Sequence, residues 1–364
     1  MAQGSALWYY AFPVVITLLA LIGYRQKWMG KFILILLLFF SMFRGDHVGN
    51  DTMNYMNESS IQYKATGIDT EDTFDNLADN FGSRTELLTI FLNQVVYYLD
   101  LPPRTIIYTY SLITMIFLFL ALRRFRVNTS MGLMFYLLSG LYYFSLTAAR
   151  QMAAVSIVLF AYTFLLEKDK KRYLFFLFIL IAAGFHASSI INILVFLLRY
   201  LKINRNVLLA LMVGVCTVCV LFAFNVMDVV YRVFNIEYVT RYMGLFDEAD
   251  RSFKGRIFDI LTYMFVFYSF YVASKEKKSN LHDSIYSVAV MLKAIFSQQS
   301  ALVARVIYGV TVFMPVYMAK TVVERKLLKN PTAIVFLMLY IVLSIYGIGK
   351  YANSALTSGY YLMF

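Results

Sequence analysis

The chain has 364 residues, of which 60% are hydrophobic, and its mean hydropathy is +0.66. Soluble domains contain about 45–50% apolar residues, so this composition excludes an ordinary soluble protein and indicates an all-α polytopic membrane protein. The formal net charge is +12, but most basic residues stand in short clusters between apolar runs. This pattern is typical of cytoplasmic loops, and we expect no nucleic-acid partner.

The apolar runs predict about twelve transmembrane helices in a single integral membrane domain that covers residues 1–364. The basic clusters, placed inside by the positive-inside rule, put both termini outside. The first run has the features of a retained helix and not of a cleaved signal peptide. The predicted helices are 7–23, 31–43, 104–122, 131–147, 151–166, 172–185, 187–200, 207–224, 257–273, 284–300, 305–321 and 332–348.

One further apolar segment does not fit this alternation. Residues 86–101 are short for a span and carry polar side chains, and a crossing here would place the basic cluster 123–126 outside. We therefore expect a re-entrant or interfacial helix on the outer side, with a full crossing as the alternative. Two larger outer loops, 44–86 and 225–256, are predicted to cap a cavity.

Four ionisable residues lie at the ends of apolar runs and fall on the same predicted side, namely Arg44, Arg150, His186 and Arg305. Ionisable groups at membrane depth are costly and usually mark a functional site. Several arginines on one face favour an anionic ligand such as phosphate or pyrophosphate. The alternatives are headgroup anchors for Arg150 and Arg305, and a polar turn residue for His186.

The helices predicted on either side of His186 have about 14 residues each, or about 20 Å as α-helices. This is less than a bilayer core of about 30 Å, so we expect a recessed, hydrated hairpin tip. His186 is the first candidate for a general base and Asp51 the second, although Asp51 is also a good helix N-cap. No metal or other cofactor is expected.

The remaining candidates have weaker support. Arg241 and Arg256 lie in or beside the second outer loop, where they are further candidates for binding pyrophosphate. Glu86, Tyr55, Tyr142 and Tyr143 are candidates for orienting substrate, the tyrosines by stacking on sugar rings, although most aromatic residues of a membrane protein serve packing or the interface. Cys216 and Cys219 are expected to be packing residues.

Several short motifs resemble the EpsG family of bacterial exopolysaccharide proteins. Arg44 is followed by Gly49-Asn50-Asp51-Thr52 and Tyr55 just after an early membrane helix. Glu86-Leu-Leu opens the next apolar segment, Arg150-Gln151-Met-Ala153 enters a helix, and Phe185-His186-Ala-Ser188 follows a basic turn and an apolar run. Asn50 stands where a small residue or Thr is expected. The resemblance covers about residues 30 to 320.

The resemblance extends to Wzy-type polymerases and implies a fold related to GT-C glycosyltransferases. It implies transfer of a growing glycan from undecaprenyl pyrophosphate to a lipid-linked repeat unit, at the outer face of the bacterial plasma membrane. Its implied partners are these donor and acceptor lipids, the bilayer, a flippase and a chain-length regulator. A lipid-linked oligosaccharide flippase or another transporter, and a membrane O-acyltransferase, remain as alternatives.

Overall fold

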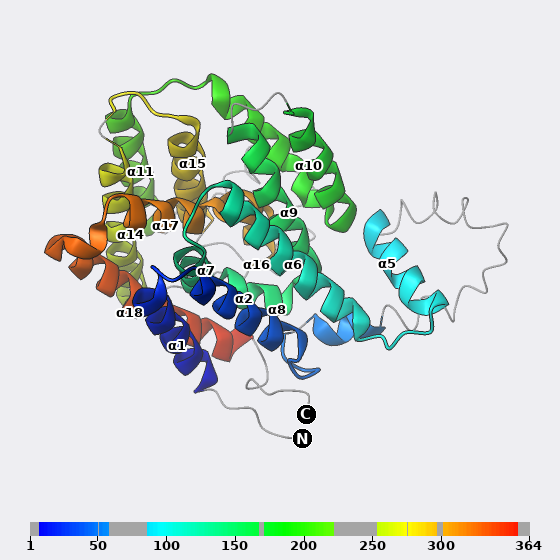
Figure 1. The fold of residues 1–364 in the computed structure, drawn as a ribbon. Helices are drawn as coiled ribbons and strands as arrows, with labels where there is room; N and C mark the ends of the chain where they lie inside the picture. Colours follow the sequence, from blue (N-terminus) through cyan, green and yellow to red (C-terminus); the bar gives the residue numbers. More distant parts are fainter. Residues whose placement is uncertain are drawn as a thin grey trace. The chain divides into compact units, whose positions relative to one another are not determined.

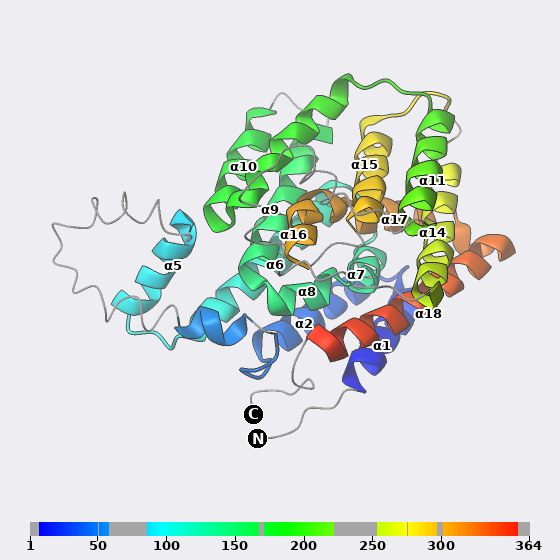
Figure 2. The same ribbon diagram turned by 180° about the vertical axis from the view of Figure 1, so that it is seen from behind.

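The computed structural model describes seven stretches of the chain. They are 7–49, 51–57, 86–166, 171–221, 253–274, 276–296 and 301–355. Within these stretches the regular secondary structure is helical, with one isolated antiparallel bridge between Asn204 and Lys278 and no strand (Figures 1 and 2). The prediction of an all-α chain is confirmed for the part that is described.

Contacts divide the chain into two compact units. Unit 1 comprises Met1–Ile193 and Ile345–Phe364, and unit 2 comprises Leu194–Ser344. Each unit is described by itself below. The single integral membrane domain predicted for residues 1–364 stays a prediction.

Unit 1 is built around the helix α9, Ala149–Leu166. Almost all its side chains are buried, and it packs against α6, α8 and α10 (Figure 1). The helices α1 and α2 pack against each other and against α7. The bounds in unit 1 are α1 Trp8–Gly23, α2 Lys27–Met42, α5 Leu87–Tyr98, α6 Thr105–Arg124, α7 Thr129–Leu138, α8 Leu141–Thr147 and α10 Tyr173–Phe185.

An aromatic cluster joins three helices of unit 1. Phe117 of α6, Phe160 of α9 and Phe178 of α10 meet edge to face, with ring centroids 4.9–6.1 Å apart. Such pairs contribute about 0.5–1.5 kcal/mol each beyond the burial of their area. The guanidinium of Arg124 lies 4.2 Å from the ring centroid of Phe164 and donates to the Thr163 hydroxyl. Aromatic packing therefore fixes α9, which carries Arg150, between its neighbours.

In unit 2 the helix α15 packs against α11, α16 and α17, while α14 packs against α11 and α17 (Figure 2). The 3₁₀-helix η1, Ala187–Tyr200, begins in unit 1 and ends in unit 2. The other bounds are α11 Arg205–Leu221, α14 Phe253–Ala273, α15 Leu281–Ile295, α16 Ala301–Thr311, α17 Phe313–Glu324, η2 Leu327–Lys329 and α18 Pro331–Ala355, which ends in unit 1.

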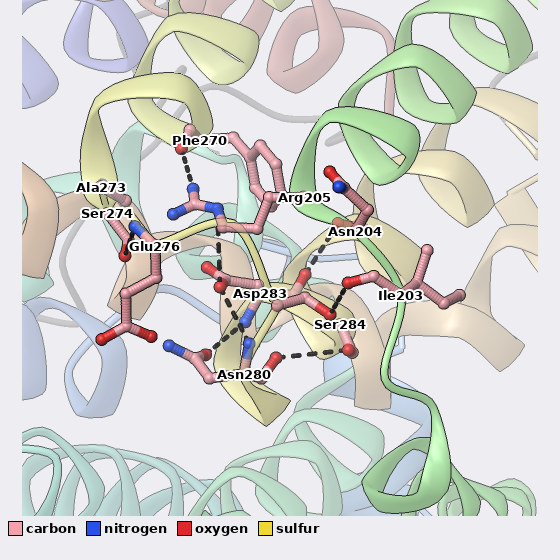
Figure 3. Close-up of polar contacts among 12 residues, drawn as sticks. Ile203, Asn204, Arg205, Phe270, Ala273, Ser274, Glu276, Asn280, Asp283 and Ser284 are labelled. Atoms are coloured by element: carbon pink, nitrogen blue, oxygen red, sulfur yellow. Dashed lines mark hydrogen bonds and ion pairs between the residues drawn. The ribbon is translucent and has the colours of Figure 1, made fainter.

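A buried ion pair ties the helices of unit 2 together (Figure 3). Arg205, the first residue of α11, lies 3.7 Å from the carboxylate of Asp283 and also donates to the carbonyl of Phe270 in α14. Asp283 accepts from the Tyr317 hydroxyl of α17 at 2.7 Å and forms a capping box with Asn280 at the start of α15. A single charged pair thus connects four helices.

The apolar helices support a membrane-embedded protein. Three helical stretches are long and apolar enough to cross a bilayer, namely Thr105–Arg124, Arg305–Glu324 and Pro331–Lys350, and shorter apolar helices accompany them. Large apolar side chains such as Val15 and Leu18 of α1 and Ile35 of α2 are exposed. Exposed apolar side chains in such number suit contact with lipid. The count of twelve spans stays a prediction.

One predicted helix is broken into two. Residues 131–147 form α7 and α8, because Gly140 takes a left-handed conformation (φ +82°) that ends α7. Left-handed glycine is a common helix terminator, so the Ser139-Gly140 pair was the sequence signal for this break. Residues 305–321 lie in α16 and α17, which meet at Val312, and the backbone of Val312 stays in the α-helical region (φ −59°, ψ −18°).

The segment after His186 is a 3₁₀-helix and not an α-helix. At about 2.0 Å per residue, 14 residues extend for about 28 Å, against about 20 Å for α-helix. The helix α10, with 13 residues, is therefore too short to cross a bilayer core, as predicted for a recessed tip at His186. The 3₁₀-helix η1 is not too short, and it gives no support to a recessed tip.

Candidate functional site

Glu86, Arg150 and His186 come together in unit 1, although 64 and 36 residues separate them along the chain. One carboxylate oxygen of Glu86, Oε2, lies 3.3 Å from Nη1 of Arg150. The other, Oε1, lies 3.1 Å from Nδ1 of His186 and accepts the backbone N–H of Ala187, also at 3.1 Å. The cluster thus contains an acid, a guanidinium and an imidazole in contact.

The approach of α5 to the end of α10 places Glu86 beside His186. Gly184 makes this approach possible, because a Cβ at that position would lie 2.8 Å from the side chain of Leu88. The Thr89 hydroxyl donates to the carbonyl of Phe185 at 3.4 Å and so satisfies one of the free carbonyls at the C-terminus of α10. His186 itself is extended (φ −155°) and ends the helix.

Arg150 is in the first turn of α9, just after a break in the helical backbone. Ala148 between α8 and α9 is non-helical (φ −104°, ψ 59°), so α9 starts in a new direction at Ala149. Its guanidinium carbon lies 5.9 Å from the ring centroid of Tyr55, within the range of a cation–π contact. The side chain of Arg150 is 18% exposed, so it is neither sealed in the core nor fully solvated.

The charges around Glu86 favour its ionised form. Burial by itself raises the pKa of this carboxyl, but the contact with His186, the charge of Arg150 and the N–H of Ala187 together outweigh burial and lower the pKa from its ordinary value of 4.5. Glu86 precedes the short helix α5 and lies outside the helices long enough to span a membrane. At neutral pH the cluster therefore contains a carboxylate.

A tight turn after α2 supports the segment that carries Arg150. Gly49 has φ +89°, and a Cβ there would lie only 1.9 Å from the carbonyl oxygen of Leu146. The Thr52 hydroxyl lies 3.5 Å from the same oxygen and 2.8 Å from the carbonyl of Val48. The turn therefore packs directly on the last residues of α8, four residues before Arg150.

Arg44 is fully buried inside this turn. Its Nη1 donates to the carbonyl of Ser41 at 2.6 Å, and its other nitrogens reach the carbonyl of Val48 and the hydroxyl of Thr52 at 3.3–3.4 Å. Arg104, just before α6, pairs with Asp46 and donates to the carbonyl of Arg44. These contacts give Arg44 a role in holding the turn, and its predicted contact with pyrophosphate stays a prediction.

The three candidate tyrosines are buried in unit 1. Tyr55 contacts the ring of Tyr110 and the guanidinium of Arg150. Tyr142 donates to the carbonyl of Leu37 at 3.0 Å, and Tyr143 meets Tyr9 edge to face. Their side chains pack in the core in this structure, and their predicted stacking on sugar rings stays a prediction.

The remaining predicted residues are in three different situations. Asp51 is half-buried and directly precedes the helical residues 52–57, and both its role as a base and its role as an N-cap stay predictions. Arg305 lies half-buried on α16 in unit 2, so its convergence with Arg150 stays a prediction. Arg256 belongs to α14, but its side chain is outside the described part. Arg241 and most of the two predicted outer loops also lie outside the described residues.

The comparison with known protein families decides the identity. The EpsG family model matches residues 27–362, which is nearly the whole chain. The chain belongs to the EpsG family. EpsG membership supports a polymerase of polysaccharide biosynthesis, and the predicted resemblance is confirmed. No curated protein and no solved structure matches this EpsG-family chain significantly.

Sequence reasoning named the three residues of this cluster but missed the residues that support them. Arg104 and the break at Ala148 had no motif of their own, and Thr52 was named only as part of the motif Gly49-Asn50-Asp51-Thr52. A usable signal was the pairing of Gly49 with Thr52, since a glycine in a left-handed turn followed by a hydroxyl residue is typical of a tightly packed loop. Nothing in the sequence indicated that Glu86 contacts both Arg150 and His186.

Proposed function

We propose that this protein polymerises undecaprenyl-pyrophosphate-linked oligosaccharide repeat units. It would transfer the growing glycan from its lipid carrier to a new lipid-linked repeat unit, in exopolysaccharide, capsule or O-antigen synthesis. The observation that carries the proposal is the contact cluster of Glu86, Arg150 and His186, in which one carboxylate contacts both a cation that suits pyrophosphate and a possible base. A GT-C-like fold in the plasma membrane, with the site on the outer face, belongs to the same proposal.

The proposed reaction is a single glycosyl transfer. A hydroxyl of the acceptor sugar attacks the anomeric carbon of the donor, and a new glycosidic bond forms as the bond from that carbon to the pyrophosphate oxygen breaks. The electron pair leaves with undecaprenyl pyrophosphate, and the hydroxyl proton passes to Nε2 of His186. Asp51 is the second candidate for this base.

Arg150 would stabilise the leaving group. Negative charge on the pyrophosphate grows in the transition state, and a guanidinium already in place stabilises this charge more than it stabilises the ground state. Arginine matches phosphate with two parallel N–H groups, which lysine cannot do. Arg305, Arg241 and Arg256 are proposed as further ligands of the pyrophosphate, and Arg44 as a residue that shapes the turn beneath Arg150.

The test uses purified full-length protein in nanodiscs with purified lipid-linked repeat units from the host, and polymer is resolved on a gel. His186→Ala should lose turnover by about 10²–10⁴-fold, the usual contribution of a general base. Arg150→Ala should abolish long polymer, and Arg150→Lys should restore it only in part. Substitutions of two exposed residues, Arg123→Ala and His47→Ala, serve as matched controls, and these variants should make polymer normally.

The outcomes separate the competing functions. If Asp51→Ala is inactive while His186→Ala is active, Asp51 is the base. If Arg150→Ala and His186→Ala both polymerise normally, the transferase site is not this cluster, and the proposal fails. Movement of the intact lipid across liposomes without polymer would then favour a flippase.

A further inference from the structure

Glu86 directs its carboxylate across the fold and not onto its own helix. It occupies the N-cap position of α5 with an extended backbone (φ −78°, ψ 148°), yet its side chain makes no capping hydrogen bond. The side chains that usually cap a helix from this position are those of Ser, Thr, Asp and Asn, and Glu is not among them. Glu86 instead contacts Arg150, His186 and Ala187. Its conformation therefore serves the cluster and not the helix.

We propose that Glu86 is the positioning residue of the transfer site, which fixes the tautomer of His186 and holds Arg150 next to it. The inference rests on the proposed function and assigns Glu86 a role through His186, with no contact to the reacting atoms. Its first support is geometric, because the two carboxylate oxygens divide between the two partners. Oε1 faces His186 and Oε2 faces Arg150.

The carboxylate decides which ring nitrogen carries the proton. An ionised carboxylate only accepts hydrogen bonds, so its contact with Nδ1 favours the tautomer of neutral imidazole that has its proton on Nδ1. Nε2 is then left with its lone pair, which a general base needs. Nε2 makes no hydrogen bond to any residue that the structure describes, and the His186 side chain is 25% exposed.

The contact between Glu86 and His186 is short but not linear. The two atoms are 3.1 Å apart, while the N–H of Nδ1 is not aligned with the oxygen. Such contacts in substrate-free enzymes commonly tighten when substrate binds. The backbone N–H of Ala187 holds the same oxygen at 3.1 Å, so the carboxylate is already anchored to the residue that follows His186.

The negative charge of Glu86 also serves both partners electrostatically. Before substrate binds, it pairs with the partly buried guanidinium of Arg150. When His186 takes the proton of the acceptor hydroxyl, the resulting imidazolium lies beside this carboxylate. A carboxylate in that place both orients the imidazole and stabilises its charged form.

The first test measures the tautomer directly. Full-length protein with ¹⁵N-labelled histidine is placed in nanodiscs, and the nitrogen shifts of His186 are identified by their loss in His186→Gln. We expect wild-type His186 to carry its proton on Nδ1. Glu86→Gln should raise the share of the Nε2–H form, because the amide NH₂ can donate to Nδ1. The exposed control Glu324→Gln should leave the His186 shifts unchanged.

The second test measures turnover with purified lipid-linked repeat units. Glu86→Gln should lower kcat on the order of 10²-fold, the lower end of what a general base contributes, with a smaller change in KM. Glu86→Asp keeps a carboxylate and should retain the Nδ1–H tautomer and part of the turnover. A residue with a purely structural role would lower the amount of folded protein without changing the tautomer.

The two proposals fail separately. A wild-type His186 with its proton on Nε2, or a tautomer unchanged in Glu86→Gln, overturns the positioning role even if His186→Ala is inactive. If the tautomer of His186 changes in Glu86→Gln while His186→Ala makes polymer normally, the positioning contact is supported and the proposed transferase is overturned. Because the wild-type measurement alone can overturn the positioning role, the test does not depend on the folding of any variant.

Discussion

At the scale of single residues, the cluster depends on a glycine that no other residue can replace. Gly49 combines a left-handed backbone with direct packing on the carbonyl oxygen of Leu146. It thereby lets the turn that contains Arg44 and Thr52 rest on the segment leading into Arg150. Any side chain here would displace that segment.

We therefore predict that Gly49→Ala destabilises the protein and lowers polymer yield. The positive φ alone costs about 1–3 kcal/mol, and the clash with Leu146 adds to this cost. Two other glycines give graded controls, since an added Cβ meets nothing within 4 Å at either. Gly140→Ala should lower the free energy of unfolding by roughly 1–2 kcal/mol, because its φ is +82°. Gly214→Ala, inside α11, should raise the free energy of unfolding by about 0.5–1 kcal/mol. Thermal unfolding in detergent measures all three, and equal melting temperatures for Gly49→Ala and Gly214→Ala would contradict the prediction.

Glu86 provides a pH prediction with a definite sign. The pKa of Glu86 is lower in the folded protein than its ordinary value of 4.5, so its contribution to stability is complete at neutral pH. This contribution is lost as the pH falls below 4.5 and through the folded pKa. When the pH is lowered from 6 to 3.5, the melting temperature of Glu86→Gln should fall by less than that of wild type. The melting temperature of Glu324→Gln should fall by as much as that of wild type. An equal loss in all three proteins would show that Glu86 is not held as a carboxylate.

At the scale of the elements, unit 2 depends on a charged pair and unit 1 on aromatic packing. Arg205 and Asp283 are both buried, and Tyr286 and Tyr317 stack beside them with ring centroids 4.0 Å apart. The guanidinium of Arg205 also lies 4.6 Å from the ring centroid of Phe270. Aromatic rings therefore surround the ion pair, and an unpaired charge buried among them would destabilise the fold.

Removing one member of this pair should be severe. Arg205→Ala leaves the Asp283 carboxylate buried without its cation, and such changes cost about 3–5 kcal/mol. We expect a strongly lowered melting temperature and little folded protein, while the exposed neighbour Lys202→Ala should resemble wild type. Replacing both charges at once, Arg205→Met with Asp283→Leu, should recover part of the loss. A melting temperature of Arg205→Ala equal to that of Lys202→Ala would mean that the ion pair does not hold the unit together.

At the scale of the whole molecule, a further prediction concerns which ends of the helices face outward. Twelve spans with both termini outside place Asp100 outside and Arg126 and Lys277 inside. In a background without Cys216 and Cys219, a membrane-impermeant thiol reagent added to intact cells should label Asp100→Cys. It should not label Arg126→Cys or Lys277→Cys until the membrane is opened. Labelling of Arg126→Cys from outside would mean that residues 86–101 cross the membrane, and the predicted topology would then be wrong.

The sequence by itself determined the chemical class of this protein. Apolar composition and regular basic clusters specify helices in a bilayer, because a backbone in lipid must satisfy its own hydrogen bonds. Short motifs around Arg44, Asp51, Glu86, Arg150 and His186 were sufficient to predict the EpsG family, which the family model confirms. Each of these signals is local, so it needs no knowledge of which helices pack together.

Only the tertiary structure decided which candidates meet. Glu86, Arg150 and His186 converge because Gly184 admits α5 against α10, and because α9 is fixed by aromatic contacts with α6 and α10. Arg44 and Tyr142 carry the same residue-level signals as Arg150 and Tyr55, yet their side chains are fixed on backbone carbonyls. Contacts between helices depend on packing between residues far apart in the chain, and a sequence pattern records only the face that is apolar and not the partner that covers it.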